Sequence, residues 1–313
     1  MPNIAGLAAL TREAAPHLGV FLASRAEAHA ITARQLADLR RAGIVARVYP
    51  RVYRFTAVAE SAEQRLRAAL AWAGPASSAA ARSAGELYAM SEVGALKPEI
   101  VVPESLRARQ PEIVVHHARR RSALMLRTIR GIPTTGPETT LQALAHVLDP
   151  VALEVACEDA RRRGLTSVSA LHRYLERFGA RGRPGTTRLR ALLAELDPRW
   201  PSRSKLEVLT RRLLVADGLA DFVREHPLVD DGRRFRYDFT FLRERVILET
   251  NGRRWHDDPA DHQRDQHKWS IPARQGFRLI FATWLDVTER PDALVIEDPL
   301  SDAAYTTLLR LLG

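Results

Sequence analysis

The stretch "RRFRYDFTFLRERVILETNG", from Arg233 to Gly252, decides how the C-terminal part of the chain folds. Its first half alternates between aromatic and polar residues, which is typical of a strand. The apolar run "RVIL" then has the composition of a short buried strand. We therefore predict a hairpin that turns at Arg243–Glu244. One face of its first strand is expected to carry four aromatic side chains, those of Phe235, Tyr237, Phe239 and Phe241.

The register of this hairpin brings two carboxylates together. Turning at Arg243–Glu244 pairs Phe239 with Leu248 and places Asp238 directly opposite Glu249. Side chains in such positions have Cβ atoms roughly 4.5–5.5 Å apart, and like charges there are destabilising. A divalent cation with oxygen ligands would resolve the repulsion. The register is an assumption, because a slip of one residue would separate the pair.

Each of these residues also has an ordinary structural interpretation. The two carboxylates can pair with neighbouring arginines, and Asn251–Gly252 is the sequence of a two-residue hairpin turn. Glu207 can pair with Arg211 at helical spacing. His256 can be a surface histidine. Taken one at a time these interpretations are favoured, whereas the joint pattern points to a metal site.

The composition suggests an acidic partner. The 313 residues carry a formal net charge of +10, and 46% of them are hydrophobic. Nucleic acid is the commonest partner of a chain this basic. The alternative is a general arginine excess, because only Lys97, Lys205 and Lys268 are lysines. A single cysteine, Cys157, excludes an intrachain disulfide. Without a signal peptide or a long apolar run, the chain is expected to be cytoplasmic and away from membranes.

Residues 1–75 have the pattern of a winged helix-turn-helix DNA-binding domain. Thr32 and Gln35 form a capping box at the start of a helix that can stop at Gly43. The stretch "VARVYPRVYRF" then reads as two extended pieces around Pro50. The alternative is a solvated helix face with a protein-binding hairpin. Six arginines are candidates for contacts with DNA phosphates: Arg34, Arg40, Arg41, Arg47, Arg51 and Arg54.

Residues 76–196 are expected to form a mixed domain without catalytic chemistry. "PEIVVHHA" reads as a strand, on which His116–His117 point to opposite faces and are therefore structural. "TGPE", Thr135 to Glu138, reads as a second capping box. The break "DPRWPSRS" makes 197–203 a candidate linker to a last domain, 204–313. The fold class is thus a multidomain α+β or α/β protein.

The order helix, strand, strand, helix, strand from Ser202 to about Leu294 resembles the endonuclease-like domains related to very-short-patch-repair endonucleases, within the PD-(D/E)xK nuclease fold. The matching motifs are a helix glutamate, an Asp on the next strand, a Glu-x-Asp-Gly-like motif, a His, an Arg-Asp pair and a Gly-aromatic strand. Their positions here are Glu207, Asp238, Glu249-Thr250-Asn251-Gly252, His256, Arg264-Asp265 and Gly276-Phe277. The remainder, roughly Leu7 to Leu196, resembles the AbiEi family of type IV toxin–antitoxin antitoxins. The stretches that carry this looser resemblance are "RVYPRVYRF", "SSAAARSAGELYAM", "GIPTTGPETTLQALA" and "ARRRGLTSVSALHRYL".

The nuclease resemblance implies hydrolysis of DNA phosphodiesters with Mg²⁺ or Mn²⁺. It implies that Asp238 and Glu249 hold the metal with the Thr250 carbonyl, and that Glu207 acts through a water or a second metal. His256 would act as general base or acid. Either Arg264 or Lys268 would stabilise the charge of the transition state.

Asn251 departs from the resemblance, because relatives carry Asp there and other members of the fold carry a catalytic Lys. Pro272 is also expected to shorten or kink the helix after Arg264. Two hypotheses follow. The chain is a metal-dependent DNA endonuclease, or it is an antitoxin-type autorepressor, with a cognate toxin and its own operator as partners and an inactive nuclease fold. An RNA-directed role is a third alternative.

Overall fold

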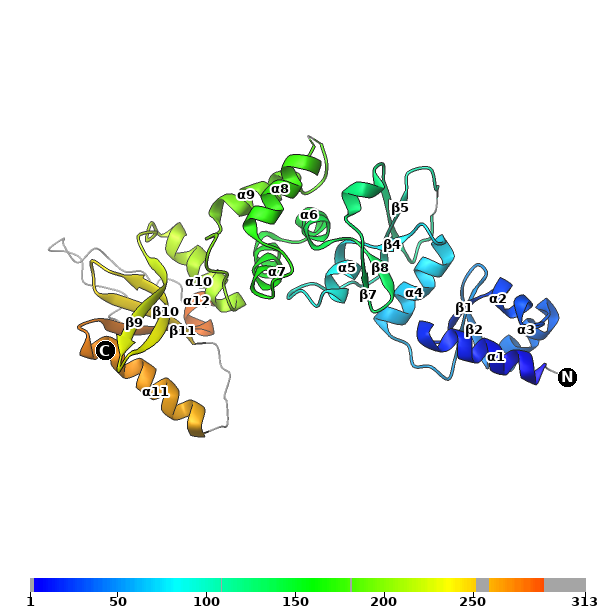
Figure 1. The fold of residues 1–313 in the computed structure, drawn as a ribbon, viewed down its shortest axis with the longest axis horizontal. Coiled ribbons are helices and arrows are strands. Elements are labelled where there is room, and N and C mark those ends of the chain that lie inside the picture. The colour runs from blue at the N-terminus through cyan, green and yellow to red at the C-terminus, as the bar shows by residue number, and fades with distance from the viewer. Residues whose placement is uncertain (1–2, 108, 181, 252–258, 290–313) are drawn as a thin grey trace. The chain divides into compact units, whose positions relative to one another are not determined.

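The computed structural model describes residues 3–107, 109–180, 182–251 and 259–289, with 259–264 described by backbone alone (Figure 1). The chain forms two compact units, Met1–Leu196 and Asp197–Gly313. Both combine helices with sheets, so the expected mixed α/β character is confirmed. Among the described helices, none combines the length and the hydropathy needed to cross a bilayer.

The first unit begins with helices and a small antiparallel sheet of strand order β1-β3-β2. The Thr32 side chain caps α3 and Gln35 completes the capping box, as the sequence predicts. Leu36 and Leu39 turn into the core that α3 shares with the sheet. The elements are α1 (Ile4–Ala14), a 3-10 turn (Ala15–His17), β1 (Val20–Leu22), α2 (Ala23–Ala28), α3 (Ala33–Arg41), β2 (Val45–Tyr49) and β3 (Val52–Phe55).

The rest of the first unit contains a five-stranded sheet of order β6-β5-β4-β8-β7 and a helical cluster around Leu141, Leu171 and Leu189. The strands are β4 (Ser78–Ala79), β5 (Glu99–Pro103), β6 (Val114–Ala118), β7 (Arg127–Ile129) and β8 (Ile132–Thr134). The helices are α4 (Ala62–Ala73), α5 (Ala81–Leu87), a 3-10 turn (Arg121–Leu124), α6 (Pro137–Val147), α7 (Pro150–Arg162), α8 (Val168–Phe178) and α9 (Thr186–Glu195).

The predicted capping box at Thr135 is wrong. Helix α6 has Gly136 as its N-cap, and no side chain caps it. The Thr135 hydroxyl instead lies 2.8 Å from the Thr140 hydroxyl, and Glu138 accepts a hydrogen bond from Thr166. A Cβ at Gly136 would lie 2.6 Å from the carbonyl oxygen of Met125, so the chain passes too close there for a larger residue. A local contact with Thr140 has taken the Thr135 hydroxyl, and a tertiary contact with Thr166 has taken the Glu138 carboxylate.

The second unit is a four-stranded sheet of order β12-β11-β10-β9, in which β11 and β12 are parallel and the other neighbours antiparallel. Leu214 of α10 packs with Phe239 and Leu248, whereas Ile271 of α11 packs with Tyr237 in a separate cluster. The elements are α10 (Lys205–Ala216), β9 (Val223–Asp230), β10 (Arg233–Phe241), β11 (Val246–Asn251), α11 (Pro259–Arg274), β12 (Arg278–Thr283) and α12 (Trp284–Thr288). Helix α11 contains Pro272 and ends two residues after it.

The predicted hairpin register is confirmed, because Phe239 faces Leu248 and Phe241 faces Val246. The prediction of a single aromatic face is wrong. Phe235 and Tyr237 belong to the cluster around Ile271, and Phe239 and Phe241 to the cluster around Leu214. The β9–β10 ladder is interrupted between these pairs, at the step of Asp238 and Glu225, where Glu225 has φ +52°. Such an irregularity re-aims the side chains that follow it.

Candidate metal centre

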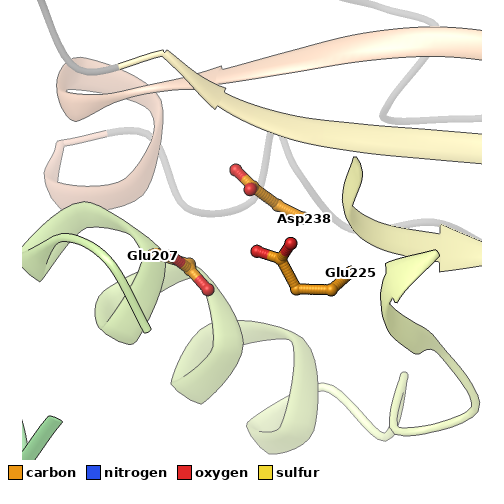
Figure 2. Close-up of side chains that lie close together, drawn as sticks. All are labelled: Glu207, Glu225 and Asp238. Atoms are coloured by element: carbon orange, nitrogen blue, oxygen red, sulfur yellow. The ribbon is translucent and has the colours of Figure 1, made fainter. Parts of the chain in front are cut away.

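Three carboxylates converge at the irregular step of the sheet. Glu207 comes from α10, Glu225 from β9 and Asp238 from β10, and one oxygen of each lies within 4.8 Å of the others (Figure 2). Glu225 and Asp238 extend from the strands toward the helix that carries Glu207. Both glutamates are buried and Asp238 is half-buried. The sequence prediction included Glu207 and Asp238 but missed Glu225.

Local structure fixes each carboxylate. Ser204 caps α10 by accepting a hydrogen bond of 3.1 Å from the Glu207 amide, which places Glu207 in the first turn. Thr250 on β11 donates to Asp238 Oδ2 from its amide at 2.9 Å and from its hydroxyl at 2.6 Å. Burial, and then the charge of Asp238, raise the pKa of Glu207 above its usual range. Negative charge is thus concentrated where solvent is scarce.

Arginines partly neutralise this charge. Buried Arg224 hydrogen-bonds to Glu207, and also donates to the Ser202 hydroxyl at 3.0 Å and to the Trp200 carbonyl at 2.7 Å. Arg203 donates from its amide to Glu207 at 2.7 Å and from its guanidinium to Glu225 Oε2 at 2.9 Å. Two of the three carboxylates therefore already have a cationic partner.

The stretch expected to be a linker contributes to this centre. Residues from Asp197 onward belong to the second unit. Trp200, Ser202 and Arg203 all contact the acidic cluster or its arginines, and Arg236 lies over the Trp200 ring at 4.3 Å from its centroid. The Pro- and Ser-containing composition correctly indicated a lack of helix and strand there. It did not reveal that the segment packs against the sheet.

Glu249 forms a fourth acidic position beside the cluster. It is buried, and the ammonium of Lys268, on α11, lies against its Oε1 as an ion pair. That oxygen has no hydrogen bond of favourable geometry among the described residues. Burial and the charge of Asp238 raise the pKa of Glu249 to about 8, although Lys268 opposes the shift. A second negative charge beside Asp238 is thus disfavoured at Glu249.

The other predicted site residues lie as follows. Thr250 acts as a hydrogen-bond donor to Asp238. Asn251, at the exposed end of β11, is paired in register with Thr283 of β12. The predicted acid–base residue His256 and the side chain of Arg264 lie outside the described residues.

Glu225 was detectable from a turn signal. Asp231–Gly232 is a typical two-residue hairpin turn, and the structure pairs Asp230 with Arg233 across it. Counting back along both strands from that pair brings Glu225 opposite Asp238. The same pairing continues in β9 and β10 on both sides of the irregular step. The Asp231–Gly232 turn therefore predicts the position of Glu225, whereas the hairpin that follows Asp238 predicts only that of Glu249.

The six arginines predicted to contact DNA lie on α3, β2, β3 and the β2–β3 turn. Arg34 and Arg40 on α3, Arg47 on β2 and Arg51 at the turn are exposed. Arg41 is exposed but is ion-paired with Asp38. Arg54 is half-buried, binds Glu60, and donates to the Val58 carbonyl at 3.1 Å. Arg54 thus has a structural role in its own hairpin.

The donor set of the centre suits a hard divalent cation. Carboxylate oxygens are the ligands that Mg²⁺ and Mn²⁺ prefer. The cluster holds three carboxylates, and the neighbouring Glu249 adds a fourth, whose Oε1 lies against the ammonium of Lys268. Arg203 and Arg224 are the competing partners of two of these groups. The residues fit such a cation, provided that at least one arginine gives way.

No protein-family profile matches the chain. Two curated relatives, the uncharacterized proteins Rv2248 of Mycobacterium tuberculosis strain H37Rv and MT2308 of strain CDC 1551, are each 28% identical to it over 153 residues. The matched stretch covers 46% of this chain and 56% of each relative, so the chain spans little more than half of their length. Among solved structures, that of the Rv2827c protein from Mycobacterium tuberculosis has a TM-score of 0.45 and 18% identity, and the match covers 62% of this chain and 78% of that chain. The names of these proteins indicate no activity, so a function for this chain is inferred from its own residues.

Proposed function

We propose that the second unit is a metal-dependent hydrolase of DNA phosphodiesters. The observation that carries the proposal is the convergence of Glu207, Glu225 and Asp238 within 4.8 Å, with Glu249 and Lys268 beside them. Buried like charges at this density are costly unless a cation compensates them. A site of carboxylates next to a lysine is suited to phosphoryl chemistry, which needs metal ligands and a positive charge near the scissile phosphate.

Two finer assignments of fold belong to this proposal. We assign the second unit to the PD-(D/E)xK nuclease fold, which is supported by a mixed sheet that carries Asp238 and Glu249 on adjacent strands and packs against α10 and α11. We assign residues 1–75 to a winged helix-turn-helix. A capped helix with an exposed arginine face, followed by the β2–β3 hairpin, supports that assignment.

The protein's residues would divide the work as follows. Glu207, Glu225 and Asp238 would hold Mg²⁺ or Mn²⁺, which would polarise a phosphate oxygen and lower the pKa of an attacking water. Thr250 orients Asp238 through two hydrogen bonds. Lys268, held against Glu249, places a positive charge at the edge of the centre. The exposed arginines on α3 and at the β2–β3 turn would bind DNA phosphates.

A nicking assay tests the proposal. Purified protein is incubated with supercoiled plasmid and Mg²⁺ or Mn²⁺, with EDTA as the metal-free control. Asp238→Asn keeps the shape of the side chain but removes a charge, so nicking should fall at least a hundredfold. Asp221→Asn is the matched control, because that aspartate is exposed in the same unit. Absence of nicking by the intact protein with either metal, or nicking that persists in Asp238→Asn, contradicts the proposal.

A second function is favoured by the arginines in the centre. Because Arg224 and Arg203 already pair with Glu207 and Glu225, and Asn251 is neutral, the same fold is suited to a protein that binds DNA without cutting it. Such a protein would be an autorepressor of the antitoxin type, acting on its own operator with a cognate toxin as its partner.

Gel shifts on the protein's own promoter region test this alternative. Replacing both Arg34 and Arg51 with Ala should weaken binding and lower the salt slope by about two. Replacing the exposed Arg173 and Arg199 with Ala removes the same charge elsewhere and is the control. Unchanged binding in the first pair would reject the assignment of this surface.

A further inference from the structure

We infer that Arg203 is a displaceable counter-ion, which a divalent cation would release from Glu225 so that it can bind a phosphate of the substrate. The inference rests on the proposed function and adds a substrate-binding residue to it. The guanidinium of Arg203 donates to Glu225 Oε2 at 2.9 Å, so it binds a carboxylate of the cluster that a cation would also bind. A guanidinium and a divalent cation repel each other and compete for the same carboxylate.

The exposure of the two partners decides which of them can move. The Glu225 side chain is only 4% exposed, whereas that of Arg203 is 62% exposed. The ion pair therefore joins a side chain at the surface of the centre to a carboxylate inside it. Glu225 is fixed and the guanidinium is free to turn into solvent. Loss of this contact costs little compared with the coordination of a cation by several carboxylates.

The backbone of Arg203 stays in place when its side chain leaves. Its amide donates to Glu207 Oε2 at 2.7 Å, next to the capping residue Ser204. A released guanidinium would thus remain within side-chain reach of the centre. Arginine binds phosphate through two parallel N–H groups. This anchoring makes Arg203 suited to the scissile phosphate or one of its neighbours.

Arg224 cannot take this role. Its side chain is 5% exposed and donates to Glu207, Ser202 and the Trp200 carbonyl. Moving it would leave a buried charge unpaired, which is strongly destabilising. Arg224 is therefore the permanent partner of Glu207, and Arg203 the exchangeable partner of Glu225. A cation would therefore displace the exposed Arg203 and not the buried Arg224.

Metal binding measured without turnover tests the competition. Mn²⁺ is titrated into the full chain and followed by electron paramagnetic resonance or calorimetry. Arg203→Ala should bind Mn²⁺ about fivefold more tightly, the equivalent of ~1 kcal/mol for the ion pair removed. Arg203→Gln should behave in the same way and serves where the alanine variant folds poorly. Arg199→Ala, which removes an exposed charge from the same segment, should change the affinity less than twofold.

DNA binding in the presence of Ca²⁺ tests the second half of the inference. Arg203→Ala should lower the salt slope for a duplex of mixed sequence by about one with Ca²⁺ present, and by nothing in EDTA. Mn²⁺ affinity that is unchanged or weaker in both Arg203 variants, or an equal loss of slope with and without Ca²⁺, overturns the inference alone. If the wild-type chain binds no Mn²⁺, the proposed function fails and the inference fails with it.

Discussion

Thr250 donates two hydrogen bonds to a single oxygen of Asp238, from its amide at 2.9 Å and from its hydroxyl at 2.6 Å. These bonds cross from β11 to β10 at the step where the β9–β10 ladder is interrupted. The amide and the hydroxyl of Thr250 both bond to the Asp238 side chain, which fixes the direction of the carboxylate. Asp238 Oδ2 is thereby held by Thr250 in a defined orientation.

Thr250→Val should weaken the centre without removing any of its carboxylates. The variant keeps the shape of the side chain and the amide bond but loses the hydroxyl bond to a charged acceptor, which is worth roughly 1.5–3 kcal/mol. We expect lower thermal stability and several-fold weaker Mn²⁺ binding, measured by thermal unfolding and titration. Thr250→Ser should retain both. Thr288→Val is the control, because its hydroxyl donates to the Trp284 carbonyl within its own helix. Equal Mn²⁺ affinity in Thr250→Val and wild type would reject the positioning role.

Glu63 should make the first unit less stable in acid. Burial raises the pKa of Glu63, but hydrogen bonds from Arg67 and Arg130 outweigh it, and the net pKa lies below 4.5. At a pH between the lowered native pKa and 4.5, the unfolded chain binds more protons at this group than the native chain, so stability rises with pH there. The contribution is fully present above about pH 4.5 and is lost as the pH falls through the native value.

Denaturant unfolding at several pH values measures this effect. Glu63→Gln should lower the free energy of unfolding at pH 7 by ~1 kcal/mol, because it leaves two arginines without a charged partner. The difference from wild type should shrink toward pH 3. Glu27→Gln, an exposed residue in the same unit, is the matched control. A difference that stays constant from pH 7 to pH 3 would show that the ion pairs do not contribute in this way.

The sequence predicted α10, the β10–β11 hairpin, α11 and β12 because their signals were local, whereas the predicted element order lacked β9 and α12. The turn at Arg243–Glu244 and the apolar run of β11 fixed the register that brings Asp238 opposite Glu249. The three-residue spacing of Thr32 and Gln35 likewise fixed the start of α3. Each signal needs only neighbours along the chain or one short turn.

Predictions failed where a distant contact decided the structure. Thr135 was expected to cap α6 together with Glu138, but Glu138 accepts a hydrogen bond from distant Thr166, and Gly136 faces the backbone of Met125. The single aromatic face was lost at the irregular step of Glu225, whose positive φ no periodicity reveals. Arg203 and Arg224 come from a segment interpreted as a linker and from a strand edge. Their pairing with the cluster depends on tertiary packing alone.

Cys157 should be inert in the native protein. Its side chain is fully buried in the helical core of the first unit, and burial, with neighbouring Glu158 and Glu154, raises the pKa of the thiol to about 12. The reactive thiolate is therefore scarce and inaccessible at pH 8. We expect alkylation by iodoacetamide at least a hundredfold slower than in denaturant. As Cys157 is the only cysteine, the reaction reports on one site. Rapid labelling without denaturant would mean that this core opens readily.

Trp200 should hold the segment before α10 against the sheet. The Arg236 guanidinium lies 4.3 Å from the centroid of its ring, and Arg236 also donates to the Glu225 carbonyl at 3.1 Å. Trp200→Ala removes a cation–π contact worth about 0.5–2 kcal/mol. We expect faster tryptic cleavage after Arg199 and Arg203, because a segment that leaves the sheet becomes a protease substrate.

Limited proteolysis followed by mass spectrometry measures this release, and Mn²⁺ titration of the same variant measures its consequence. Because Trp200 supports the arginine that bonds to the backbone of Glu225, Trp200→Ala should also weaken Mn²⁺ binding severalfold, whereas Trp200→Phe should preserve both properties. Trp284→Ala removes a tryptophan that is 48% exposed in the same unit and is the matched control. If Trp200→Ala is cleaved no faster than Trp284→Ala, the segment is held in place by the hydrogen bonds of Arg224 instead of by the ring.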